Sequence, residues 1–217
     1  MSMTSVPFRP SPSDHEEPPM TKDDISGRVR LHELKTLSDN HYMLRRASFD
    51  YRRRDGVWQH QVRESYDIGD AAVVLPLDRP RRRVVLIRQF RWPVFESGYR
   101  QPLIEAIAGK LDGDTPEVCI VREAMEEAGI TIGNARLVAN CFASPGAVKE
   151  RSSCFLADYD STAPRAAGGG HEHEGEDIEV LEMTLDEAVG LIAAGEIVDM
   201  KTILLLQAAK LERTQSP

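Results

Sequence analysis

The sequence predicts a protein of the α+β class, in which several strands precede the first helix and further strands and helices follow it. Two observations lead to this prediction. Short runs rich in valine and isoleucine, separated by turn signals, occur in the first half of the chain. A later segment repeats apolar residues at helical spacing, and two more helical segments close the chain. The length of 217 residues allows one domain with a small appendage.

The N-terminal part of the chain is expected to hold a tail and a hairpin region. Residues 1–25 carry five of the 13 prolines and few aliphatic side chains, which predicts a disordered tail. Residues 26–66 follow as a β-hairpin region, because Asp55 and Gly56 form a turn signal between two segments of alternating polarity. The main domain is then expected at residues 67–213.

The main domain is expected to combine strands with three helices. The expected strands are 71–77, 84–90, 103–108, 135–142, 152–159 and 178–183. The first helix begins near the capping residues 114–117 and stops at Gly129. Its apolar residues at helical spacing are expected to face the core, namely Val118, Val121, Met125 and Ala128. A second helix follows a capping box at 184–187, and a third runs from about residue 200 to 211.

The balance of charge argues against binding to nucleic acid or to a membrane. The chain has 27 Lys and Arg against 35 Asp and Glu, so its net charge of -8 gives no positive field that attracts polyanions. The basic runs 52–54 and 81–83 lie at expected turns without the aromatic neighbours that stack bases. No apolar run approaches the length of a membrane span. Three cysteines without a C-x-x-C pair fit a reduced, cytoplasmic protein.

A group of carboxylates lies on one face of the first expected helix. Glu123 and Glu127 are four residues apart and Glu126 is three from Glu123, so the three side chains share a face and repel one another. Mg²⁺ prefers oxygen ligands and often bridges carboxylates to substrate phosphates, which would reverse this repulsion. Arg122 can hold Glu126 and leave the other two carboxylates for the metal. A solvated acidic face is the alternative interpretation.

The loop ahead of this helix, 108–114, contains glycines and extends the pattern. Loop and helix together resemble the Nudix box, G-x5-E-x7-R-E-U-x-E-E-x-G-U, in which U is a bulky aliphatic residue. The matching residues are Gly109, Arg122, Glu123, Met125, Glu126, Glu127, Gly129 and Ile130. The chain departs from the box at two points. The interval from Gly109 to Arg122 is one residue shorter, and Asp114 or Thr115 stands where the family has its first glutamate.

The likeness extends to the GDP-mannose pyrophosphatase branch of the ADP-ribose pyrophosphatase-like Nudix proteins, over roughly residues 28–210. The segments that resemble this branch are 37–40, 85–91, 111–120, 144–146, 177–182 and 201–206. Pro145 also stands where the ADP-ribose-type subfamily typically has proline. The resemblance implies the Nudix fold, a mixed β-sheet sandwiched between helices (α/β/α). It also implies a homodimer that pairs through the early hairpin.

Carried over position by position, the resemblance assigns roles to single residues. The ligands of Mg²⁺, or of Mn²⁺ in its place, would be Glu123, Glu126, Glu127, Glu176 and the carbonyl oxygen of Ala108. The base that activates water would be Glu176 or Glu174. Further catalytic residues would be Glu127 and Glu150. The substrate contacts would be Arg91, Arg88, Tyr66 and Glu150.

Several of these residues have simpler interpretations from composition alone. Residues 171–177 read as a flexible acidic loop, and His171 with His173 lacks the cysteine or further histidine of a transition-metal site. Tyr66 and Trp58 are able to stack on a nucleobase or to stabilise a dimer interface, and packing in a core or an interface fits them better.

The expected reaction is hydrolysis of the diphosphate bond of a nucleoside diphosphate sugar, with GDP-mannose and ADP-ribose as leading substrates. The products would be a nucleoside monophosphate and a sugar phosphate. One alternative keeps the enzyme but changes the substrate to NADH, a dinucleoside polyphosphate or coenzyme A. Another alternative is a non-catalytic Nudix domain that senses a nucleotide sugar, although a binding protein would not need the charge cluster at residues 122–127.

Overall fold

The structure is a computed structural model that describes residues 24–171, 173 and 175–212. These residues form two compact units. The first unit contains the described residues up to 35 together with 46–63, and the second contains 36–45 and 64 onward. The tail expected at residues 1–25 lies outside the described residues, apart from its last two, so it stays a prediction. The hairpin region expected at 26–66 contributes residues to both units.

The first unit is formed by parts of a four-stranded sheet, and three long strands make up most of this sheet. They are β1 (Val29–Asp39), β2 (Met43–Arg52) and β3 (Trp58–Asp67), in the order β1-β2-β3-β9 with the short β9 (Val148–Lys149). The expected turn joins β2 to β3, where Gly56 takes a φ of 84° and donates its N–H to the Arg53 carbonyl at 3.0 Å. The hairpin prediction is confirmed. Strand β1 was not expected, because almost all of it is exposed and its apolar residues do not alternate regularly.

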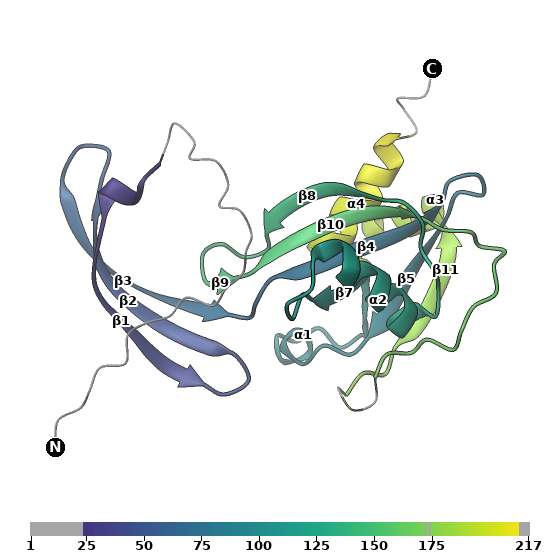
Figure 1. The fold of residues 1–217 in the computed structure, drawn as a ribbon, viewed down its shortest axis with the longest axis horizontal. Helices are drawn as coiled ribbons and strands as arrows, with labels where there is room; N and C mark the ends of the chain where they lie inside the picture. The colour runs from purple at the N-terminus through teal and green to yellow at the C-terminus, as the bar shows by residue number, and fades with distance from the viewer. Residues whose placement is uncertain (1–23, 172, 174, 213–217) are drawn as a thin grey trace. The chain divides into compact units, whose positions relative to one another are not determined.

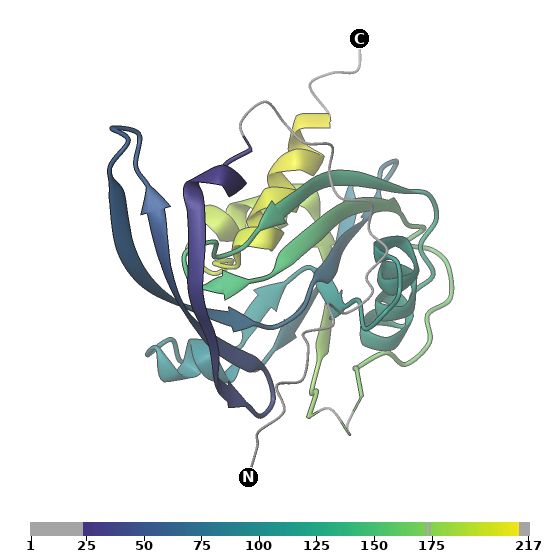
Figure 2. The same cartoon turned by 60° about the vertical axis from the view of Figure 1, so that its left-hand side comes forward.

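The second unit is built around a mixed sheet of seven strands (Figures 1 and 2). The main path runs β11-β5-β4-β10-β8, while β6 pairs with β5 and β7 pairs with β4. Strand β10 is parallel to β4 and antiparallel to β8. The strands are β4 (Ala71–Asp78), β5 (Arg83–Gln89), β6 (Leu103–Glu105), β7 (Ile107–Lys110), β8 (Ala135–Phe142), β10 (Arg151–Asp158) and β11 (Glu179–Thr184).

Helices cover both faces of this sheet (Figure 1). On one face, α2 (Pro116–Ala128) packs against alternate residues of β4 and β5, such as Val74 and Ile87. On the other face, α3 (Leu185–Ala193) and α4 (Met200–Glu212) pack against the intervening residues, such as Leu75 and Leu86. Strand alternation thus divides the apolar residues between two cores. The expected α/β/α sandwich of the α+β class is confirmed.

Two features of the second unit differ from expectation. The strand expected at 103–108 is two strands, β6 and β7, which separate at Ala106 and pair with different neighbours. A short helix, α1 (Trp92–Glu96), also follows β5. Its five residues are too few to show helical periodicity in a sequence. Among the described residues, no helix has both the length and the apolar character needed to cross a bilayer.

The capping signals of α2 are confirmed, but of the four residues expected to face the core only Ala128 does so. Thr115 caps the helix by accepting the Val118 N–H at 3.4 Å, and Gly129 ends it at a φ of 64°. The side chains of Val118, Val121 and Met125 are exposed. The buried face consists of Cys119, Ile120, Glu123, Ala124, Glu127 and Ala128. The helix therefore turns Ile120, three smaller residues and two carboxylates inward, while Val118, Val121 and Met125 remain in solvent.

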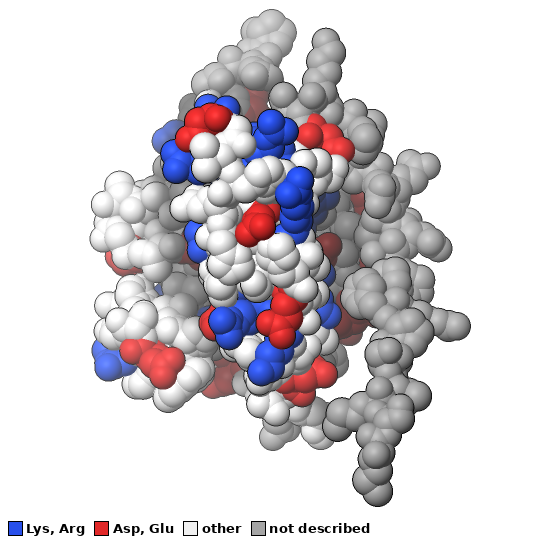
Figure 3. Space-filling model, turned by 90° about the vertical axis from the view of Figure 1, so that its left-hand side faces the viewer, with Lys and Arg blue, Asp and Glu red and all other residues white. Residues whose placement is uncertain are grey.

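Each of the two basic runs that the sequence places at turns contains an arginine paired with an acidic side chain. Arg53 pairs with Asp55 at 3.1 Å, and Arg82 pairs with Asp186 at 2.9 Å. Figure 3 views the face that carries the β1–β3 sheet and shows Lys and Arg side chains interspersed with Asp and Glu. The charges of Arg53 and Arg82 are therefore partly offset by their acidic neighbours.

Candidate active site

Two buried carboxylates project from α2 toward strand β7. The exposed fraction of Glu127 is 1% and that of Glu123 is 9%. The backbone N–H of Ala108 donates to Glu127 Oε2 at 3.2 Å, which fixes this carboxylate against the strand. Carboxylates are rarely buried unless they are paired or bind a metal, so this pair requires a partner.

A glycine makes room for Glu123. A Cβ atom added to Gly109 would overlap the Oε1 and Cδ atoms of Glu123, so no larger residue fits at 109 while Glu123 keeps its place. The φ of Gly109 is ordinary, so it is this close approach that requires glycine. The glycine at the start of the box-like pattern therefore has a steric role at the carboxylate cluster, the name used here for Glu123, Glu126 and Glu127 of α2.

Arg122 holds the polar side of the cluster together. Its Nη1 atom donates to Glu123 Oε1 at 2.8 Å and to Glu126 Oε2 at 3.0 Å, while Nη2 donates to the Lys110 carbonyl at 3.3 Å. Arg122 holds Glu126 as expected, but the expectation that it leaves Glu123 free is wrong, because the same nitrogen binds both carboxylates. Arg122 thus ties α2 to the end of β7 and orients two members of the cluster.

The loop that leads to Glu176 begins with a glycine-rich segment, residues 166–170, which is hydrogen-bonded to the C-terminal end of α2. Backbone N–H groups of Ala166, Gly169 and Gly170 donate to the carbonyls of Gly129, Glu127 and Glu126, at 2.8, 2.8 and 3.0 Å. Gly168 lies so close to the helix end that a Cβ atom there would come within 2.7 Å of the Ala128 carbonyl carbon. No role is expected for these glycines from the sequence, although three consecutive glycines, 168–170, are a signal of such a close contact.

The docked loop brings Glu176 toward the carboxylates of α2. Glu176 Oε2 accepts the backbone N–H of His171 at 2.9 Å, and the His171 ring pairs with Glu126 at 3.4 Å. The charge of Glu176 raises the pKa values of both Glu123 and Glu127, as a nearby carboxylate does. Glu174, the alternative base, lies outside the described residues.

Burial strongly perturbs the acidity of the innermost carboxylate. Burial raises the pKa of Glu127 to about 8, and the charges of Glu123 and Glu176 add to this shift. The Ala108 N–H and the charge of Arg91 act in the opposite direction. Burial also raises the pKa of Glu123. A cluster that resists ionisation near neutral pH is suited to a divalent cation, which favours the ionised carboxylates.

The raised pKa of Glu127 predicts that the metal-free protein loses stability as pH rises. Its carboxyl keeps its proton up to about pH 8 in the folded state, whereas the unfolded chain releases it near the ordinary glutamate pKa of 4.5. Stability should fall between these two values by on the order of a few kcal/mol. Thermal melting in EDTA at about pH 5 and about pH 8.5 measures this loss, and added Mg²⁺ should reverse it at the higher pH. Equal melting temperatures at the two pH values would contradict the prediction.

A second charged group lies beside the cluster and includes two residues that the sequence reasoning missed. The Nε of Arg91 donates at 2.8 Å to Glu105 Oε2, whose carboxylate is buried at the end of β6. Lys201 pairs with Asp199 at 2.7 Å. Burial lowers the pKa of Lys201, but the charges of Asp199, Glu105 and Glu150 more than compensate and raise it. Glu105 and Lys201 lie far apart in the sequence, so only the fold brings them together.

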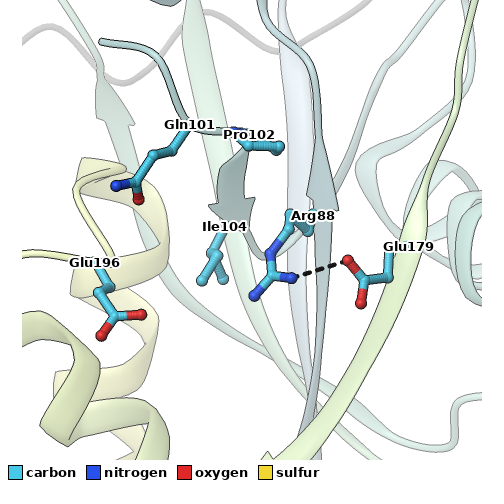
Figure 4. A pocket seen from close by; sticks show the side chains of 6 residues that line it. All are labelled: Arg88, Gln101, Pro102, Ile104, Glu179 and Glu196. Atoms are coloured by element: carbon cyan, nitrogen blue, oxygen red, sulfur yellow. Dashed lines mark hydrogen bonds and ion pairs between the residues drawn. The ribbon is translucent and has the colours of Figure 1, made fainter.

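The structure locates Glu150 and Arg88 in different surroundings. Glu150 accepts the Ser152 hydroxyl at 3.2 Å and lies in the field of Lys201. Arg88 pairs with Glu179 at 2.9 Å and lines an open pocket (Figure 4). The other residues of this pocket are Gln101, Pro102, Ile104, Glu179 and Glu196. Because Leu86 belongs to the core beneath α3 and α4, strand alternation directs Arg88 to the sheet face opposite α2.

Tyr66 belongs to an aromatic group next to the glycine loop. Its ring contacts that of Tyr42 edge to face, with centroids 5.5 Å apart, and Tyr66 is partly exposed. The ammonium group of Lys110 lies 4.0 Å from the centre of the Tyr42 ring. The rings therefore lie near the side chain of Lys110, the residue after Gly109, and offer an apolar surface for a planar ligand group.

Comparison with known proteins gives consistent results for both parts of the chain. A family model described as the GDP-mannose pyrophosphatase NudK N-terminal domain matches residues 28–66, and the NUDIX domain model matches residues 68–206. GDP-mannose pyrophosphatase from Pectobacterium atrosepticum is 43% identical over 186 residues, which cover 85% of this chain and 95% of that protein. The enzyme of that name from Cronobacter sakazakii is 45% identical over 188 residues, with coverages of 86% and 97%.

A solved structure resembles the fold at much lower sequence identity. The crystal structure of an ADP compounds hydrolase matches with a TM-score of 0.65 and 16% identity, covering 87% of this chain and 96% of that chain. At this identity the match supports the fold alone.

Proposed function

The chain belongs to the Nudix family, and we propose that it hydrolyses the diphosphate bond of a nucleoside diphosphate sugar to a nucleoside monophosphate and a sugar phosphate. GDP-mannose and ADP-ribose are the leading substrates. The observation that carries the proposal is the buried pair Glu123 and Glu127, fixed by Gly109, Ala108 and Arg122 and faced by Glu176.

The donor set of this site fits a hard divalent cation. We propose that Mg²⁺ is held by oxygen atoms of the carboxylate cluster and the nearby strand, namely Glu123, Glu126, Glu127, Glu176 and the carbonyl of Ala108. Mn²⁺ is the expected substitute. The bound cation would neutralise negative charge on the substrate phosphates. The raised pKa of Glu127 supports this assignment, because the carboxylates ionise most readily when a cation lies among them.

The protein residues would position the reactants and move one proton. Glu176, or Glu174 beside it, would accept the proton of the water that attacks phosphorus. Arg91, which Glu105 orients at 2.8 Å, would donate hydrogen bonds to phosphate oxygens as negative charge develops. Glu150 would act near the scissile phosphates, while Arg88 and Tyr66 remain proposed substrate contacts. The leaving group is a phosphate monoester, which needs little protonation.

The substrate preference is tested by a panel assay. The purified chain is incubated separately with GDP-mannose, ADP-ribose, UDP-glucose, NADH and a diadenosine polyphosphate, with and without Mg²⁺. A phosphatase then releases inorganic phosphate from the monophosphate products, and this phosphate is measured. The expected result is Mg²⁺-dependent turnover of the first two substrates above the other three. Faster turnover of NADH or of the polyphosphate would favour the alternative substrates. Binding of a nucleotide sugar without turnover would favour the sensing domain and overturn the proposal.

We also propose a homodimer in the cytoplasm. Residues 26–66 would form the dimerisation region and residues 67–213 the hydrolase domain, a division that the boundary between the two matched domain models supports. Exposed apolar side chains in the first unit support a role in pairing, among them Val29, Leu31, Val57 and Val62. The three cysteines are free, which fits a reducing compartment.

A further inference from the structure

A group of two histidines and one aspartate converges within the first unit. His32, Asp50 and His60 lie on the adjacent strands β1, β2 and β3, and their ligand atoms are all within 4.8 Å of one another. None of the three takes part in the carboxylate cluster. Each strand contributes one side chain, so a ligand bound by all three would link the three strands.

The distances around Asp50 suit a shared metal ion. His32 Nε2 lies 2.9 Å from Asp50 Oδ2, and His60 Nδ1 lies 3.1 Å from Asp50 Oδ1. Two ligands that bind the same zinc ion at about 2.0–2.2 Å in a tetrahedron lie about 3.4 Å apart. The two histidines therefore approach different oxygens of one carboxylate at nearly the separation that a common ion requires.

The histidine rings are placed for coordination. The second ring nitrogen of His60, Nε2, lies 3.4 Å from the Ser48 hydroxyl, a type of contact that orients metal-binding histidines. The two rings are 5.8 Å apart between centroids and tilted by 37°, so neither blocks the other. Both imidazoles are about half exposed, which gives an ion direct access from solvent.

We propose that His32, Asp50 and His60 form a binding site for a first-row transition-metal ion, with Zn²⁺ as the principal occupant. Imidazole nitrogens favour Zn²⁺ or Cu²⁺ over Mg²⁺, so this site differs in chemistry from the carboxylate cluster of the second unit. Three protein ligands leave at least one coordination position for water or for an external group. The bound ion would link β1, β2 and β3 and stabilise the first unit.

The test measures metal binding by the full chain with Mg²⁺ in excess to occupy the carboxylate cluster. Calorimetric titration with Zn²⁺ should detect one site, and the electron paramagnetic resonance spectrum of added Cu²⁺ should show coupling to two imidazole nitrogens. His60→Asn and Asp50→Asn should each weaken Zn²⁺ binding at least about 100-fold, since even supporting residues of metal sites cost about 10–100-fold. His60→Asn should also reduce the nitrogen coupling of Cu²⁺ to one imidazole.

His171→Asn is the matched control, because it removes a histidine that contacts the carboxylate cluster instead. Zn²⁺ affinity should be unchanged in this variant. Loss of binding in His171→Asn with retention in His60→Asn would assign the ion to the carboxylate cluster and overturn the proposal. Failure of the wild-type chain to bind Zn²⁺ in the presence of Mg²⁺ would overturn it as well. Melting curves in EDTA confirm that each variant is folded.

Discussion

Replacement of Glu127 by glutamine is expected to lower the rate of diphosphate hydrolysis on the order of a thousandfold while the fold stays intact. Glutamine has nearly the same shape, so it fills the same buried space and can still accept the Ala108 N–H. It cannot supply the negative oxygen that a divalent cation requires. The measurement is kcat with GDP-mannose at saturating Mg²⁺, together with a melting curve.

Glu117→Gln is the matched control, because Glu117 lies in the first turn of the same helix and is exposed. Its rate should stay within about twofold of the wild-type rate, as for most surface changes. Glu127→Gln also provides an internal check on folding, since it removes the group whose pKa is raised to about 8. The variant should therefore lack the loss of stability with rising pH that the metal-free wild type shows. Near-normal turnover in Glu127→Gln would refute the assignment of the site.

Replacement of Gly109 by alanine is the second change with a large expected effect, a loss of about 100-fold in kcat. The new Cβ would overlap Glu123 Oε1 and Cδ, so the carboxylate must move away from its place beside Glu127. A displacement of about 1 Å in a catalytic site commonly costs on the order of 100-fold in rate. The midpoint of the Mg²⁺ titration should rise in parallel, because one of its expected ligands is misplaced.

Gly190→Ala serves as the control for Gly109→Ala. Gly190 lies in α3 with no atom within 4 Å of the position of an added Cβ, so alanine there should leave activity unchanged. Its effect on stability should be a gain of about 1 kcal/mol at most, through higher helix propensity. If Gly109→Ala kept both its rate and its Mg²⁺ requirement, then Glu123 would not be a ligand in this position.

The sequence was most informative where the relevant residues lie close together along the chain. Glu123, Glu126 and Glu127 share one helix, so helical geometry alone placed them on one face, and the caps of α2 followed from Thr115 and Gly129. The same periodicity misjudged Val118, Val121 and Met125. Spacing identifies a helix face but not its direction, and the inward face here consists of Ile120, three smaller residues and two carboxylates.

Residues that the fold assembles from distant segments were harder to predict. Glu105 and Lys201 lie far apart in the sequence, and only the contact between the end of β6 and the start of α4 brings their charges near each other. Glu176 was nominated by family resemblance, while the glycines that dock its loop on α2 went unnoticed. His32, Asp50 and His60 lie on three separate strands, one of which, β1, was not predicted at all.

The central claim, that this chain cleaves a diphosphate bond at the carboxylate cluster, is tested most directly by identifying the products formed from GDP-mannose. The protein is incubated with the substrate in EDTA and then with Mg²⁺ restored, and the products are separated, then identified and quantified by mass spectrometry. The expected products are GMP and mannose 1-phosphate in equal amounts, formed only after Mg²⁺ is restored. Release of GDP and free mannose would show that the glycosidic bond is cleaved and not the diphosphate bond, and would refute the claim.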